Sequence, residues 1–147
     1  MVDLDKVKPK LGAIFGLIGS VILLIVGLGS FTMNSYMYSY GSVPIFIPYI
    51  TSIVTAAISA LGMYGAVIVF RDDFTGYTFL LIAGIIGIIG TFIPIYVYID
   101  EWDWAYTFYL SSSGAFIDLV FMLVGGILGF ALAEKKERNE ESQIIKK

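Results

Sequence analysis

Long apolar stretches separated by short polar segments dominate the chain. Four of these stretches each reach the roughly 20 residues that a helix needs to cross about 30 Å of hydrocarbon. They run over residues 11–29, 45–70, 77–99 and 105–133. A bilayer offers no water to backbone groups, so a helix is the expected state of each stretch. The pattern predicts an all-α fold, an integral membrane four-helix bundle that forms one domain over residues 1–133. A charged tail over residues 134–147 follows it.

Composition supports a membrane location and narrows the chemistry. Of the 147 residues, 58% are hydrophobic and 14% are charged, whereas about a quarter of a typical soluble domain is charged. The chain has no Cys and no His. Disulfides and thiolate metal sites are therefore excluded, and the commonest general base and metal ligand is absent. We expect no cofactor and no bound metal.

The basic residues are placed unevenly along the chain. All nine lie at one end of an apolar stretch or in a tail: Lys6, Lys8, Lys10, Arg71, Lys135, Lys136, Arg138, Lys146 and Lys147. Residues 30–45 and 99–106 contain none. Short cytoplasmic loops retain Lys and Arg, so this partition predicts that both termini and the turn at Arg71 are cytoplasmic. No basic face exists elsewhere, and a nucleic-acid partner is not expected.

Small residues mark the predicted contacts between helices, because helices in lipid associate where their backbones approach closely. The glycines expected to lie at such contacts are Gly12, Gly16, Gly84, Gly87, Gly125 and Gly129. In the second stretch, small and hydroxyl residues recur in steps of three and four at Ser52, Thr55, Ser59, Gly62 and Ala66. This stripe is either a packed face or the lining of a polar path.

Pro94 interrupts the third predicted helix near its outer end. It has no N–H, so the carbonyl of Gly90 loses its helical donor and a local kink is expected. The hydroxyl of Thr91 is a candidate for compensating that loss.

Asp118 is the only ionisable residue well inside a predicted span, near its midplane. A carboxylate at that depth should face protein or water rather than lipid. Helical spacing places Ser111 on the same face, and we expect a hydrogen bond from Ser59 or Thr55. This intramembrane polar site has three possible roles: fixing the helix register, holding a proton or cation in a small transporter or channel, or contacting a partner subunit.

Aromatic and acidic residues gather in the outer loops. The predicted outer-face patch consists of Trp102, Trp104, Asp100, Glu101 and Asp103. An interfacial aromatic belt explains much of this enrichment. The acidic residues form either a solvated turn or a site for a hard cation such as Ca²⁺, and the aromatic residues either pack the loops into a cap or engage a partner.

No nucleophile–base pair, phosphate-binding loop or paired carboxylates are found, so an enzyme is not expected. The start Lys8-Pro9-Lys10-Leu11-Gly12, the repeated Gly-x-x-Gly spacings and the final Gly125-Gly126-Ile127-Leu128-Gly129 helix resemble small four-span prokaryotic membrane proteins of unknown function. The apolar stretches and the partition of basic residues imply lipid as the first partner, and we expect the membrane to be the cytoplasmic membrane of a prokaryote. We expect a structural or accessory subunit of a membrane assembly, or a self-associating bundle. The alternative is a small proton- or cation-coupled transporter or channel centred on Asp118.

Overall fold

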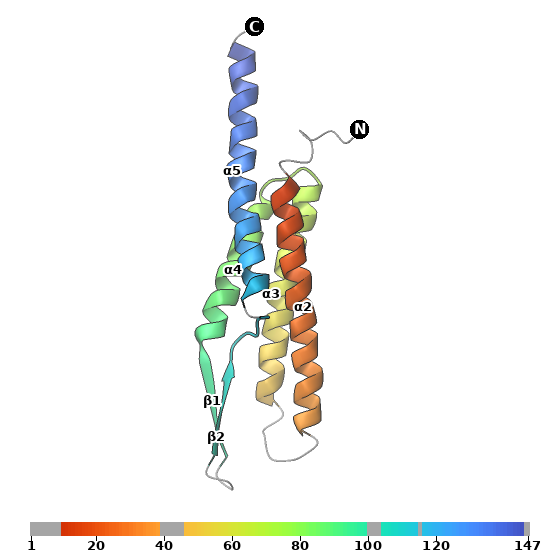
Figure 1. Cartoon of the computed structure of the whole chain (residues 1–147), viewed down its shortest axis with the longest axis vertical. Helices are drawn as coiled ribbons and strands as arrows, with labels where there is room; N and C mark the ends of the chain where they lie inside the picture. Colours follow the sequence, from red (N-terminus) through yellow and green to blue (C-terminus); the bar gives the residue numbers. More distant parts are fainter. Residues whose placement is uncertain (1–9, 39–45, 100–103, 115, 146–147) are drawn as a thin grey trace.

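The computed structural model describes the backbone of residues 10–38, 46–99, 104–114 and 116–145, and the side chains of 10–32, 49–96, 109–114 and 116–133. Four helices and a two-stranded hairpin make up this part of the chain (Figure 1). In order they are α2 (Leu11–Tyr38), α3 (Phe46–Phe70), α4 (Gly76–Phe92), β1 (Pro94–Ile99), β2 (Trp104–Tyr109) and α5 (Ile117–Ile145).

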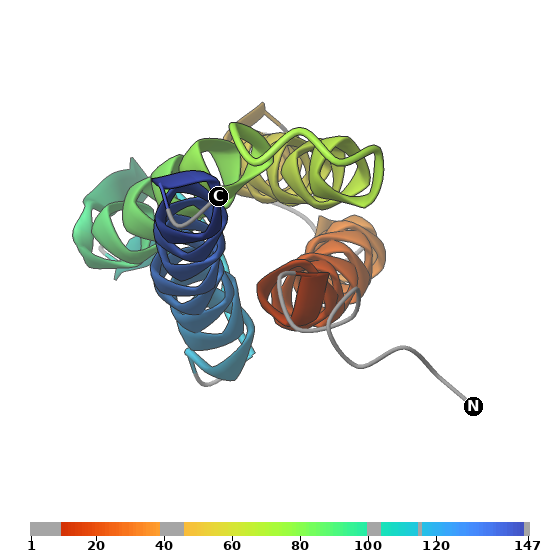
Figure 2. The same cartoon turned by 90° about the horizontal axis from the view of Figure 1, so that it is seen from above.

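The helices are packed in a ring. α2 packs against α3 and α5, and α4 packs against the same two helices from the other side (Figure 2). α2 begins and α5 ends at one end of the bundle, which we call the terminal end. The hairpin lies toward the opposite, hairpin end, and the last turns of α5 extend beyond the other helices (Figure 1). The chain is thus mostly helical, with four helices packed together, as the sequence predicted.

Within the described side chains, two helices are long and apolar enough to cross a membrane. Their apolar windows are Leu11–Thr32, with a mean hydropathy of 2.6, and Tyr49–Phe70, with a mean hydropathy of 2.1. Only 39% of each window is buried within the chain, so much of this apolar surface faces outward. The apolar helical segments Gly76–Phe92 and Ile117–Ala133 are shorter.

The prediction is wrong for the end of the third helix and for the start of the fourth helix. Residues 94–99 and 104–109 form antiparallel strands, with Pro94 opposite Tyr109 and Ile99 opposite Trp104. α4 therefore ends at Phe92 rather than near residue 99, and α5 begins at Ile117 rather than near residue 105. Proline disfavours a helix interior, and the β-branched and aromatic residues of these two segments favour strands. α5 continues through the predicted tail as far as Ile145.

Close backbone contacts hold α2 against α5. A Cβ atom added to Gly125 would lie 2.5 Å from the carbonyl oxygen of Gly12 and 2.6 Å from the nitrogen of Gly16. An added Cβ on Gly12 would meet Gly125 and Gly129 in turn. Gly84 and Gly87 of α4 face leucine side chains of α5. All six glycines expected at helix contacts are buried against a neighbouring helix.

The turn between α3 and α4 is tied to the start of α2. Lys10 Nζ lies 2.8 Å from Asp72 Oδ1 and donates to the carbonyl of Phe70 at 3.2 Å. In the same turn, both the hydroxyl and the backbone N–H of Thr75 donate to Asp73. These two bonds, the hydroxyl bond more than the backbone one, lower the pKa of the Asp73 carboxyl. The contacts of Lys10 hold the start of α2 beside this turn at the terminal end.

Candidate functional site

A cluster of buried polar side chains lies inside the ring of helices. Its members are Ser20, Thr51, Ser52, Thr55, Ser59, Ser111 and Asp118. They come from α2, from α3, from the segment between β2 and α5, and from the first turn of α5. Among the side chains that the structure describes, every buried nitrogen and oxygen atom has a hydrogen-bond partner. Each buried polar atom of this cluster thus has at least one partner in the protein, and we call the cluster saturated in this sense.

Asp118 is fully buried, and protein donors bind both of its carboxylate oxygens. Oδ1 accepts from the hydroxyl of Ser113 at 2.6 Å and from the N–H of Leu119 at 2.9 Å. Oδ2 accepts from the N–H of Gly114 at 3.0 Å. Asp118 lies in the first turn of α5, where the helix dipole favours an acidic group. Hydrogen-bond donors and a helix end thus surround the carboxylate in place of a cation.

The hydrogen bond predicted between Asp118 and the second stretch is not formed. Ser59 instead donates to the carbonyl of Ser20 at 2.7 Å, and Thr55 donates to the carbonyl of Thr51 at 2.7 Å. The reason is the break before α5, which brings the closer donors Ser113 and Gly114 to the carboxylate. Nearby donors of the same chain segment replace the distant ones.

Residues 110–114, which we call the connecting segment, run without regular structure between β2 and α5. The surrounding helices satisfy its backbone groups. Ser111 donates its N–H to the carbonyl of Gly90 at 3.1 Å and its hydroxyl to that of Gly87 at 2.9 Å. Ser112 donates its N–H to Thr55 Oγ1 at 2.9 Å. Ser111 is buried beside α4, and it does not share a helical face with Asp118.

The same segment explains how the chain accommodates Pro94. The carbonyl of Gly90, which Pro94 deprives of a helical donor, accepts the N–H of Ser111. The hydroxyl of Thr91 donates to the carbonyl of Ile88 at 2.7 Å. The prediction that the Thr91 hydroxyl replaces the lost donor of the Gly90 carbonyl is therefore wrong. At the point where a kink was expected, α4 ends.

Phe116 adopts an uncommon backbone conformation directly before α5. Its φ angle is 64°, which is unfavourable for a bulky side chain. Its N–H donates to Ser113 Oγ at 2.8 Å, and its ring stacks on Phe92 with the centroids 5.8 Å apart. Ser113 therefore joins the strained residue to the buried carboxylate, and this link fixes the point at which α5 begins.

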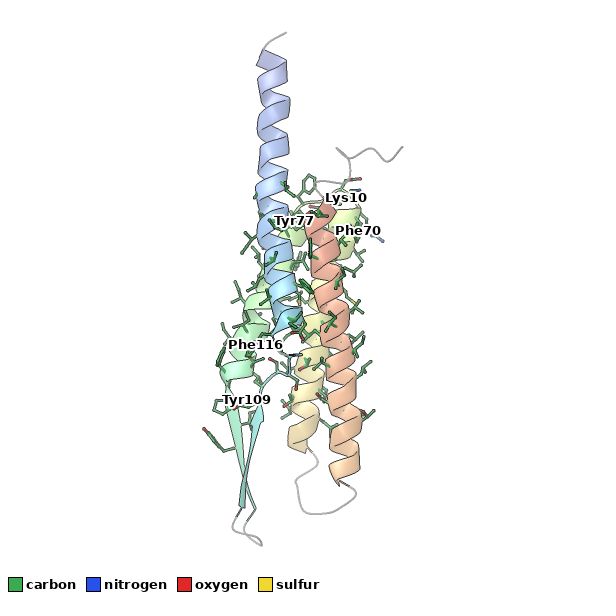
Figure 3. The ribbon with its side chains drawn as sticks, in the orientation of Figure 1. Lys10, Phe70, Tyr77, Tyr109 and Phe116 are labelled. Atoms are coloured by element: carbon green, nitrogen blue, oxygen red, sulfur yellow. The ribbon has the colours of Figure 1, made fainter. Side chains whose placement is uncertain are left out.

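The connecting segment lies well inside the bundle. Figure 3 labels Tyr109 and Phe116, which flank it, far from Lys10 and Phe70 at the terminal end. An added Cβ on Gly114 would lie 3.3 Å from the side chain of Val26 in α2. Ser112, Ser113 and Gly114 are nevertheless only partly buried.

The predicted outer-face patch cannot be placed. Asp100, Glu101, Trp102 and Asp103 lie outside the described residues, as does the side chain of Trp104. In the described parts of the chain, no group of three acidic side chains is placed to hold a metal ion.

Sequence reasoning missed Ser113 and Thr51, and it placed Ser20 and Gly114 on packed helix faces without predicting their hydrogen bonds. A cluster of Ser and Gly between two apolar segments is typical of a loop, so the run Ser111-Ser112-Ser113-Gly114 carried the signal for a break before Asp118. Comparisons of the chain with protein-family models, with curated proteins and with solved structures found no match.

Proposed function

We propose that the protein is a non-enzymatic integral membrane protein. Its role is that of a structural or accessory subunit in a membrane assembly, or of a bundle that associates with itself. All four helices are embedded, both termini are cytoplasmic, and the membrane is the cytoplasmic membrane of a prokaryote. The observation that carries the proposal is the contrast between a saturated polar interior and an apolar perimeter.

The apolar perimeter supports embedding of all four helices. Large apolar side chains are exposed on each of them, including Ile25, Ile53, Phe92, Ile117 and Ile127. Such a continuous apolar exterior is unfavourable in water and favourable in lipid or against another membrane subunit. The basic residues Lys10 and Arg71 lie at the terminal end, which supports a cytoplasmic location for that end.

The saturated interior supports a structural role for Asp118. Both carboxylate oxygens are engaged by donors from the connecting segment and from the first turn of α5. A buried polar network in which every group is paired fixes one arrangement of the elements around it. These bonds support a role of Asp118 in determining where α5 begins.

Purification from native membranes in a mild detergent tests this function. A subunit of an assembly elutes with a stoichiometric partner, and a self-associating bundle elutes as an oligomer of defined mass. Native mass spectrometry distinguishes the two. A monomer with no partner, recovered intact from native membranes, would contradict the proposal.

A second candidate is a small proton- or cation-coupled transporter or channel. The observation that favours it is a carboxylate beside an irregular segment inside a ring of helices. Transporters build their sites from such interrupted helices. Purified protein in proteoliposomes should then carry a proton or cation flux that Asp118→Asn abolishes while the protein remains folded. A wild-type protein without flux would exclude this candidate.

A further inference from the structure

We infer that a water-filled vestibule opens at the hairpin end and reaches Ser112, Ser113 and Gly114 of the connecting segment. It admits water and small hydrophilic solutes from the outer side of the membrane. The inference rests on the membrane placement in the proposed function and does not depend on the accessory role.

The first step is the depth of the connecting segment. Gly114 packs beside Val26 of α2, and Ser112 bonds to Thr55 of α3. At a rise of 1.5 Å per residue, Val26 lies about 9 Å from Thr32, the last residue of the apolar window within the described side chains of α2. Thr55 lies about 9 Å from Tyr49, the first residue of the window within the described side chains of α3. The segment is therefore level with the apolar parts of both helices.

The second step is the partial exposure of polar residues with irregular backbone at that depth. Ser112, Ser113 and Gly114 are partly exposed and lie outside any helix or strand. Irregular backbone at membrane depth is tolerated only where protein buries it or where it lines a water-filled cavity. The chain does not bury these three residues completely, and hydrocarbon cannot solvate them. Water is the solvent that satisfies the exposed part.

The third step is the direction in which the vestibule opens. Toward the terminal end, the buried cluster of Leu23, Ile58, Ala83, Leu119 and Met122 fills the centre of the bundle. Its members are fully or almost fully buried, so they block a path in that direction. Toward the hairpin end, α4 stops at Phe92 and α5 begins only at Ile117, so α2 and α3 continue there beside the hairpin without the other two helices to close the ring (Figure 1). The open side therefore faces the hairpin and the outer solution.

The vestibule stops one hydrogen bond short of the buried carboxylate. Ser113 is partly exposed, and its hydroxyl donates to Oδ1 of Asp118, which is fully buried. Water in the vestibule thus reaches the donor of Asp118 and does not reach Asp118 itself.

Cysteine accessibility tests the vestibule, because the chain has no native cysteine to interfere. Ser112→Cys is the main variant, since the hydrogen bond of Ser112 to Thr55 comes from its backbone N–H. Ser113→Cys is the second variant. A permanently charged methanethiosulfonate reagent is applied to right-side-out native membrane vesicles, and modification is followed by mass spectrometry. A size-exclusion profile like that of the wild type establishes that each variant is folded.

Two control variants isolate the effect of water. Ile25→Cys replaces a side chain on the perimeter of α2 that is 63% exposed, and Ser59→Cys replaces a fully buried one. Only a thiolate reacts, and a thiolate does not form readily in lipid or in a dry core. Ser112→Cys or Ser113→Cys should therefore react at least about tenfold faster than both controls.

The possible outcomes separate the inference from the proposed function. Reaction of both connecting-segment variants as slow as that of Ile25→Cys would overturn the vestibule and leave the membrane placement intact. Fast reaction of Ile25→Cys would overturn the membrane placement itself. Reaction only in inside-out vesicles, or only after purification from native partners, would also overturn an outward-facing vestibule in the native membrane.

Discussion

Asp118 is bound by three donors, and they divide between its two oxygens. An amide at this position keeps one oxygen and turns an NH₂ group toward a donor. Asp118→Asn should therefore lower the free energy of unfolding by about 1–3 kcal/mol, the cost of a buried group left unpaired. Denaturant unfolding in detergent measures the change.

Asp72→Asn is the matched control for that substitution. Asp72 is exposed and forms an ion pair with Lys10, and its φ angle of 68° is one that asparagine tolerates. Loss of an exposed ion pair should cost no more than about 1 kcal/mol. Equal losses in the two variants would show that the donors around Asp118 contribute nothing specific.

Gly125 and Gly29 offer a second comparison at the residue scale. An added Cβ on Gly125 would meet backbone atoms of Gly12 and Gly16, which cannot move aside without shifting α2. Gly125→Ala should therefore destabilise the bundle by about 1–3 kcal/mol.

Gly29 lies in α2 with no heavy atom within 4 Å of an added Cβ. Gly29→Ala should change the stability by less than about 1 kcal/mol, in the stabilising direction. Thermal unfolding of both variants in the same detergent gives the comparison. A Gly125→Ala protein as stable as Gly29→Ala would contradict the close packing of α2 against α5.

At the scale of the elements, the sequence predicted α3 almost to the residue and the beginning of α2. Their apolar stretches are long and are limited by charged residues at the terminal end. The hairpin was missed because the number of apolar residues in 77–99 and 105–133 outweighed the strand preference of residues 94–99 and 104–109. The hydrogen-bond partners of Asp118 lie at the interruption of the predicted fourth helix before α5. Residue spacing along an assumed continuous helix therefore could not predict them.

The hairpin register is directly testable. Tyr96 and Thr107 are opposite one another in the ladder, and Ile95 is opposite Phe108. Opposite residues in an antiparallel pair bring their Cβ atoms within about 4.5–5.5 Å, close enough for a disulfide after modest adjustment. The double variant Tyr96→Cys/Thr107→Cys should form a disulfide under mild oxidation, detected by mass spectrometry after digestion.

The double variant Tyr96→Cys/Phe108→Cys is shifted by one residue and points its two thiols to opposite faces. It should cross-link far less efficiently. Equal cross-linking in both variants would contradict the register, and no cross-linking in either would favour the continuous helices that the apolar pattern first suggested.

For the whole molecule, the halves of the ring differ in apolar length. The windows of α2 and α3 contain 22 residues each, which is about 33 Å of helix, whereas α4 contains 17 residues, about 26 Å. The hairpin and the connecting segment complete the shorter half toward the hairpin end. This asymmetry places the irregular, partly exposed segment on the side away from the basic residues.

The orientation proposed for the whole molecule can be measured with two single cysteines. Arg71 lies in the exposed turn at the terminal end, and Tyr96 lies on the hairpin with its side chain mostly exposed. Because short loops that retain basic residues stay in the cytoplasm, Arg71→Cys should react with a membrane-impermeant maleimide only in inside-out vesicles. Tyr96→Cys should react only in right-side-out vesicles. Labelling of both from the same side would rule out the proposed crossing of the membrane, and the reverse pattern would place the termini outside.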